Sequence, residues 1–139
     1  MYDQLVSADK PLRVLVYSDD RDVRSAVLSA LGARPHPDLP PFDYVEVATE
    51  PVVFQHLDAG GIDLVILDGE AVPVGGMGIA RQVKDEIYQA PPVLVITGRP
   101  QDAWLATWSR AEAAVSHPIE PIRLAEAVIA LARGVLQPG

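Results

Sequence analysis

With 139 residues and no cysteine, the chain is expected to form one domain around a single core. The lack of cysteine excludes disulfides, a thiolate nucleophile and a cysteine-ligated metal. The net charge of −8 and the scattered positions of the 11 Lys and Arg residues argue against nucleic-acid binding. The start of the sequence lacks the pattern of a signal peptide, and no apolar run reaches the roughly 20 residues that span a bilayer. We therefore expect a cytoplasmic protein that binds neither nucleic acid nor membrane.

Short apolar runs alternate along the chain with segments whose apolar residues recur at helical spacing. The apolar runs predict five strands, at about residues 12–17, 44–47, 62–67, 93–96 and 113–115. The other segments predict five helices, at about residues 23–31, 50–59, 77–88, 101–111 and 121–136. The domain is expected to cover residues 12–136, with a lead-in over residues 1–11 and a tail over residues 137–139.

Five consecutive strand–helix units are typical of an α/β fold with a parallel sheet and helices on both faces. We predict a doubly wound, five-stranded parallel sheet of the flavodoxin-like type, with strand order 2-1-3-4-5. In this order the first and third strands lie side by side, and ligands bind beyond their carboxyl ends. Residues 33–41 contain four prolines and predict a loop, which is longer than the roughly 2–6 residues usual at such a connection.

Polar residues stand at the ends of four predicted strands. Asp19 and Asp20 follow the first strand, and Asp68 ends the third. Thr97 follows the fourth strand and His117 the fifth. Each residue alone has a simpler interpretation, as a helix N-cap for either aspartate of the pair and as a turn residue for the others. Because the carboxyl ends of parallel strands share one edge of the sheet, their coincidence favours a functional site there.

The three carboxylates also indicate which ion the site prefers. Carboxylates that lie close together repel one another unless a cation is present. Oxygen ligands without a thiolate favour a hard ion, Mg²⁺ before Ca²⁺, and a Mg²⁺ ion held by carboxylates commonly completes its shell with phosphate oxygens. The sequence therefore predicts a Mg²⁺ site at Asp19, Asp20 and Asp68, and phosphoryl chemistry with Asp68 as the candidate nucleophile.

Taken together, these motifs resemble the receiver domain of two-component response regulators, the CheY-like domains. The matching segments are 14–20, 63–68, 95–98 and 117–118, and the resemblance covers about residues 12–136. It implies that Asp68 accepts a phosphoryl group from a histidine kinase or another phosphodonor, and that Thr97 contacts the phosphoryl oxygens. It also implies a signalling domain rather than an enzyme.

The resemblance assigns the remaining site residues as well. The acidic pair Asp19 and Asp20 would hold Mg²⁺ together with Asp68 and the backbone carbonyl of Glu70. His117 stands where the family has a lysine that pairs with the phosphoryl charge and precedes a cis proline.

The chain departs from the family pattern at three places. Histidine titrates near neutral pH, whereas the lysine that His117 replaces is a permanent cation. Ala114 replaces an aromatic residue that serves as a rotameric switch in the family, and Pro73 comes one residue later than the family's proline. We therefore expect phosphorylation to switch this domain poorly. The alternative is a pseudo-receiver that binds partner proteins without phosphorylation.

Two other classes of protein share parts of this pattern. A flavodoxin would need a phosphate-binding loop rich in Ser, Thr and Gly after the first strand, but the segment 18–21 is acidic. A haloacid-dehalogenase-like phosphatase would need its nucleophile after the first strand and a second aspartate two residues later, and the segment 19–22 does not fit cleanly. Both classes are therefore less favoured than a receiver.

Output is expected through contact with a downstream protein, because only three residues follow the last predicted helix. Trp104 and Trp108 lie four residues apart and so share one side of a predicted helix. We expect at least one of them to pack in the core. The other is a candidate anchor for a partner or for a homodimer formed through residues 101–136.

Overall fold

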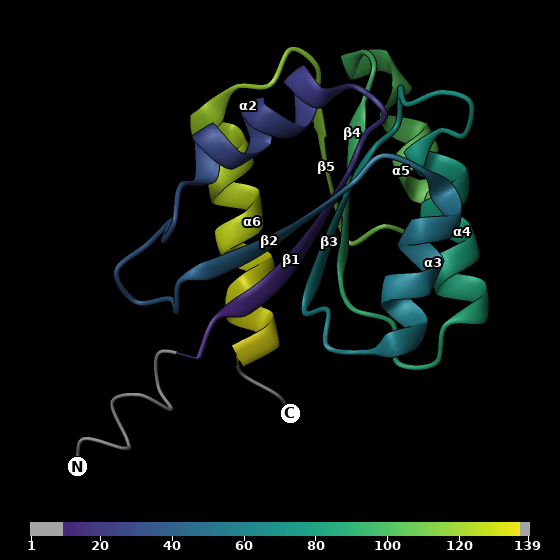
Figure 1. The fold of residues 1–139 in the computed structure, drawn as a ribbon. Coiled ribbons are helices and arrows are strands. Elements are labelled where there is room, and N and C mark those ends of the chain that lie inside the picture. The colour runs from purple at the N-terminus through teal and green to yellow at the C-terminus, as the bar shows by residue number, and fades with distance from the viewer. Residues whose placement is uncertain (1–9, 137–139) are drawn as a thin grey trace.

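The computed structural model describes residues 10–136, without the side chain of Ala103, and shows a sheet between two layers of helices (Figure 1). Most of the predicted lead-in, residues 1–9, and the predicted tail, residues 137–139, lie outside the described residues. Five strands run parallel in the order β2-β1-β3-β4-β5, which confirms the predicted doubly wound fold. They are β1 (Leu12–Tyr17), β2 (Phe42–Val47), β3 (Leu64–Asp68), β4 (Val93–Thr97) and β5 (Ala113–Ser116).

The helices divide between the two faces of the sheet (Figure 1). One face is covered by α2 (Arg21–Leu31) and α6 (Pro121–Leu136). The other face is covered by α3 (Glu50–Ala59), α4 (Gly76–Glu86) and α5 (Ala103–Ser109), the last preceded by the 3-10 turn η1 (Pro100–Asp102). None of the helices within residues 10–136 combines the length and the apolar character that crossing a membrane requires.

The residues of β3 alternate between two hydrophobic cores, one on each face of the sheet. All five residues of β3 are buried, as expected for a central strand of a parallel sheet. Leu64 and Ile66 pack into the core beneath α2 and α6, whereas Val65 and Leu67 pack into the core beneath α3, α4 and α5. The next residue, Asp68, ends the strand with a carboxylate that is only 3% exposed.

The starts of two strands differ from the prediction because pairing, rather than apolar character, decides where a strand begins. β2 starts at Phe42, since Phe42 already pairs with Leu12 of β1. β3 starts at Leu64 instead of residue 62. There the Asp63 carboxylate accepts the backbone N–H of Arg13 at 2.9 Å.

Two predicted helices are shorter than expected. The helix predicted at residues 101–111 is divided into η1 and α5, and α5 ends where Arg110 adopts a left-handed conformation with φ of 66°. α4 ends at Glu86, so that Ile87 and Tyr88 lie outside it. The side chain of Tyr88 is exposed.

The proline-rich loop of residues 33–41 packs against the domain. Leu39, near its end, is buried in the core beneath α2 and α6. A guanidinium nitrogen of Arg133 in α6 lies 3.4 Å from His36 Nε2 in the loop. The loop therefore joins α2 to β2 while covering part of α6.

Two glycines of α4 test how closely this helix packs on the end of β3. A Cβ atom at Gly76 would lie 2.7 Å from the Asp68 carbonyl oxygen, whereas a Cβ at Gly78 would meet open space. We expect Gly76→Ala to lower the free energy of unfolding by about 1–3 kcal/mol through overpacking. Gly78→Ala should leave it unchanged or raise it by up to about 1 kcal/mol, because alanine favours helix. Urea unfolding of both variants measures the difference, and equal stabilities would contradict the close packing.

Candidate functional site

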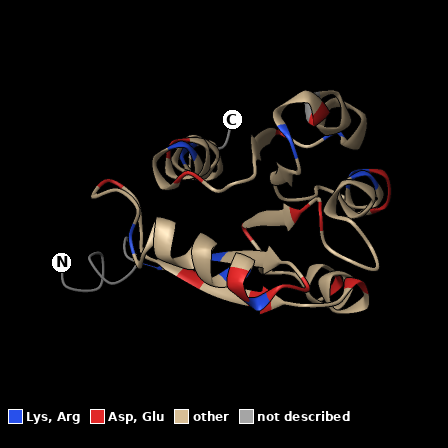
Figure 2. Cartoon of the chain, turned by 90° about the horizontal axis from the view of Figure 1, so that it is seen from above, with Lys and Arg blue, Asp and Glu red and all other residues tan. Residues whose placement is uncertain are grey.

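The carboxyl ends of the strands form the edge that Figure 2 views from above, where acidic segments gather around the end of a central strand. A pocket of about 310 Å³ opens at this edge. It brings together five of the residues predicted from the sequence, and its lining consists of Asp19, Asp20, Val23, Asp68, Glu70, Val72, Gly98 and His117. The predicted convergence is therefore present for these five residues, whereas Thr97 at the end of β4 lines another pocket.

The Asp68 carboxylate accepts hydrogen bonds from three segments of the chain. Oδ2 accepts the hydroxyl of Ser18 at 2.8 Å. Oδ1 accepts the backbone N–H of Glu70 at 2.9 Å and lies 3.0 Å from His117 Nε2. An ionised carboxylate can only accept, so Nε2 acts as the donor to it. Three donors compensate for the burial of this charged group, which would otherwise be costly.

Ser18 is a polar site residue that the sequence prediction missed. It follows the last residue of β1, is fully buried, and donates its N–H to the Val47 carbonyl of β2 at 3.1 Å. Its hydroxyl oxygen also accepts the backbone N–H of Asp20 at 3.1 Å. The available signal was a hydroxyl residue directly after an apolar strand and before the acidic pair.

The two aspartates after β1 have structural roles as well as lining the pocket. Asp20 is the N-cap of α2, and its side chain accepts the backbone N–H of Asp22 at 2.8 Å. Asp19 accepts the backbone N–H of Val72 at 2.9 Å, which ties the β3–α4 loop to the end of β1. The simpler N-cap interpretation is thus correct for Asp20.

The oxygen ligands expected for Mg²⁺ line the pocket without forming a ready cluster. Their chemistry suits the ion, since carboxylate and carbonyl oxygens are the ligands that Mg²⁺ prefers. However, the carboxylates of Asp19, Asp20 and Asp68 each accept a hydrogen bond from the protein. Within residues 10–136, no group of three or more His, Asp or Glu side chains is placed to hold a metal ion. Metal binding would require some of these carboxylates to exchange their partners.

His117 reaches the site although it is shorter than lysine. Its backbone N–H donates to the Thr97 carbonyl at 2.8 Å, which joins the segment after β5 to the end of β4. The bond between His117 and Pro118 is cis, as in the family pattern. The imidazole lies beside Asp68, and the side chain of His117 is 23% exposed, so it borders both the buried carboxylate and the solvent.

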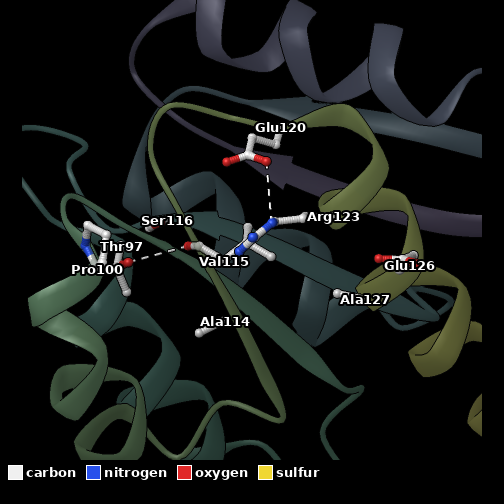
Figure 3. A pocket seen from close by; sticks show the side chains of 9 residues that line it. All are labelled: Thr97, Pro100, Ala114, Val115, Ser116, Glu120, Arg123, Glu126 and Ala127. Carbon is white, nitrogen blue, oxygen red and sulfur yellow. Dashed lines mark hydrogen bonds and ion pairs between the residues drawn. The ribbon is translucent and has the colours of Figure 1, made fainter.

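Thr97 lines a different pocket, shown in Figure 3. Its hydroxyl lies 3.3 Å from the carbonyl of Arg99 and 3.4 Å from that of Val115. The second pocket has a volume of about 720 Å³ and is lined by Thr97, Pro100, Ala114, Val115, Ser116, Glu120, Arg123, Glu126 and Ala127. The small side chain of Ala114 borders it, at the position where the family has an aromatic ring.

Tyr17, the last residue of β1, anchors the β3–α4 loop. Its hydroxyl donates to the Val74 carbonyl at 2.5 Å. Burial, followed by the negative charges of Asp19, Glu50 and Asp68, raises the pKa of Tyr17. The phenol therefore stays protonated and remains a hydrogen-bond donor at neutral pH.

Both tryptophans of α5 are exposed, so the expectation that at least one packs in the core is wrong. Trp104 is 66% exposed and Trp108 46%. The guanidinium carbon of Arg81 in α4 lies 4.9 Å from the centroid of the Trp108 ring, and Arg81 also donates to the Trp108 carbonyl at 2.9 Å. Trp108 is therefore held by a cation–π contact on the surface.

Comparison with known proteins gives relatives that cover most of the chain. No protein-family model matches the chain. A protein of Mycobacterium tuberculosis, named an uncharacterized response regulatory protein, is 63% identical over 122 residues, which cover 88% of this chain and 92% of that protein. Response regulatory proteins from two strains of Mycobacterium tuberculosis match this chain with the same identity.

Solved structures share the fold at much lower sequence identity. A CheY-like receiver domain protein from Methanospirillum hungatei has a TM-score of 0.74 at 15% identity, covering 94% of this chain and 100% of that one. The signal receiver domain of a LuxO repressor-like protein from Vibrio parahaemolyticus has a TM-score of 0.74 at 20% identity, covering 91% and 94%. The fold, the site at the strand ends and the 63% identical relative together show that the chain belongs to the response regulators and folds as a CheY-like receiver domain.

Proposed function

We propose that the chain is the receiver of a two-component phosphorelay, in which Asp68 accepts a phosphoryl group from a histidine kinase or another phosphodonor. The observation that carries this proposal is the Asp68 carboxylate, which ends β3, borders the pocket of about 310 Å³ and has one oxygen in contact with His117. Membership of the response regulator family supports it. The phosphorylated domain would act by contact with a downstream protein.

His117 and Thr97 are proposed to interact with the phosphoryl group. The imidazole already lies 3.0 Å from Asp68 Oδ1 and is partly exposed, so it can exchange this contact for a phosphoryl oxygen. Thr97 is placed at the end of the neighbouring strand β4, but its hydroxyl has to turn away from the carbonyls that it now contacts. The histidine therefore supports the group more directly than the threonine.

Mg²⁺ is the proposed cofactor of this site, as is general for receiver domains. Asp19, Asp20, Asp68 and the backbone carbonyl of Glu70 would hold it, and the bound ion would offset the negative charge of carboxylates and phosphoryl group. Since Asp19 and Asp20 accept hydrogen bonds from Val72 and Asp22, the ion competes with these contacts.

The second candidate function is a pseudo-receiver that binds partners without phosphorylation. The three donors around Asp68 favour it, because they satisfy the carboxylate in the unphosphorylated chain. Ala114 favours it too, because its side chain has no rotamer to report phosphorylation. Chemical modification of Asp68 separates the two candidates.

For phosphorylation, the chain is incubated with Mg²⁺ and a small phosphoramidate or acyl phosphate, and its mass is measured. We expect one added phosphoryl group on the wild type and none on Asp68→Asn, because an amide is not a nucleophile for phosphorus. Asp63→Asn, at the residue just before β3, is the matched control, and it should be modified like the wild type. An unmodified wild type that still binds a partner would establish the pseudo-receiver instead.

The His117→Lys variant tests how the domain responds to phosphorylation. Lysine carries a permanent, longer-reaching charge, so this variant should bind beryllofluoride and Mg²⁺, a mimic of phosphorylation, more tightly than the wild type. Amide chemical shifts should change near Asp68 in both proteins without spreading to α5, because a ligand without different contacts in two states shifts no equilibrium. Wild-type changes that extend over α5 would contradict weak switching.

The exposed surface of residues 101–136 is the proposed interface for a partner or a second copy. Trp104 is its candidate anchor, since tryptophan is favoured at binding hot spots and this indole is 66% exposed. We expect concentration-dependent dimers in sedimentation velocity, weakened at least roughly tenfold by Trp104→Ala. Tyr88→Ala removes an exposed aromatic ring outside this surface and should leave the dimer unchanged. A wild type that stays monomeric at every concentration would rule out self-association.

A further inference from the structure

The contacts of Ser18 leave one acceptor for its hydroxyl proton. Its backbone is fixed on both sides, by the N–H bond to Val47 of β2 and by Arg24, whose guanidinium donates to the Ser18 carbonyl at 2.7 Å. The Oγ atom of Ser18 accepts a hydrogen bond from the backbone N–H of Asp20. The hydroxyl proton is therefore left for Asp68 Oδ2, 2.8 Å away.

The two oxygens of Asp68 consequently differ in their surroundings. Oδ2 is held by a fully buried residue with a fixed backbone. Oδ1 is held by Glu70 and His117, both of which line the pocket. Of these two partners the imidazole is a partly exposed side chain, so its contact with Oδ1 is the one that can be given up.

We propose that Ser18 is a positioning residue for phosphoryl transfer at Asp68: it holds Oδ2 and leaves Oδ1 as the oxygen that attacks phosphorus. This inference rests on the proposed function of Asp68. In the forward step the Oδ1–P bond forms while the P–N or P–O bond of the donor breaks. The leaving group keeps the electron pair and takes a proton from water.

The direction of the effect on phosphorylation follows from the transition state. Phosphoryl transfer passes through a loose transition state, in which the nucleophile has lost little of its charge. Removing the Ser18 hydrogen bond therefore makes the carboxylate only slightly more reactive. It also allows the carboxylate to rotate away from the line of attack, and misplacement of a reacting atom costs up to about a hundredfold. The loss of orientation dominates, and phosphorylation becomes slower.

Hydrolysis of the phosphorylated form depends on Ser18 in a different way. A water molecule attacks phosphorus, the P–Oδ1 bond breaks, its electron pair returns to Asp68, and the proton of the water goes to solvent. In a loose transition state the departing carboxylate already carries most of its negative charge. The Ser18 hydroxyl stabilises this charge at Oδ2, because hydrogen bonds to charged groups are stronger than those to neutral carbonyls. Without the hydroxyl, hydrolysis becomes slower as well.

The test compares wild type, Ser18→Ala and Ser18→Thr with a small phosphoramidate as donor. Phosphorylation rates are measured against donor concentration, and the half-life of the phosphorylated form is measured after the donor is removed. We expect Ser18→Ala to lower the maximal rate roughly tenfold with little change in the donor concentration at half-maximal rate. The half-life should lengthen severalfold. Ser18→Thr keeps the hydroxyl and should restore both values toward the wild type.

The half-life separates positioning from general damage to the site. A site that is merely loosened admits water and hydrolyses faster, so a shorter half-life in Ser18→Ala overturns the inference. If Ser18→Ala has the same phosphorylation rate and half-life as the wild type, the inference about Ser18 is also overturned. In that case phosphorylation of the wild type still supports the proposed function of Asp68. If none of the three proteins is phosphorylated, the proposed function fails and the proposed role of Ser18 fails with it. Thermal unfolding of each variant confirms that the compared proteins are folded.

Discussion

A buried carboxylate at the end of the central strand is the constraint on which this site depends. Asp68 is 3% exposed, and burying an ionised carboxylate is costly unless hydrogen bonds compensate for the lost water. The compensation comes from Ser18 after β1, the Glu70 N–H after β3 and His117 after β5. A single charged group thus requires three segments far apart in sequence to meet at one edge of the sheet.

The register of the parallel strands brings these segments together. Tyr17 pairs with Leu67 across β1 and β3, so the residues that follow them, Ser18 and Asp68, are neighbours. On the other side, Thr97 pairs with Ser116, which places His117 directly beyond β5. A slip of one residue in either pairing would turn each side chain to the opposite face of the sheet. The hydrophobic alternation that fills the two cores therefore also aligns the polar residues.

Close backbone packing below the site complements these hydrogen bonds. A Cβ atom added to Gly69, Gly75 or Gly76 would lie 2.7–2.8 Å from a backbone carbonyl oxygen. The segment after Asp68 therefore returns tightly over the end of β3, and Tyr17 holds its middle through Val74. The site also includes the partly exposed His117, and the larger pocket is lined by Thr97 and Ala114. The site therefore joins a closely packed base to a partly exposed outer surface.

The sequence by itself determined the five strand–helix units and the set of residues at the strand ends, because apolar periodicity and chain order encode them directly. The strand order was predicted as the common one for five such units. Asp19, Asp20, Asp68, Glu70 and His117 accordingly line one pocket. Only the tertiary structure decided which atoms pair. The hydroxyl of Ser18, the outward turn of both tryptophans and the lining of the second pocket by Thr97 depend on contacts between residues up to 50 positions apart. Periodicity tells which face a residue occupies, but the partner of a polar atom on that face is set by neighbouring strands and by the space around it.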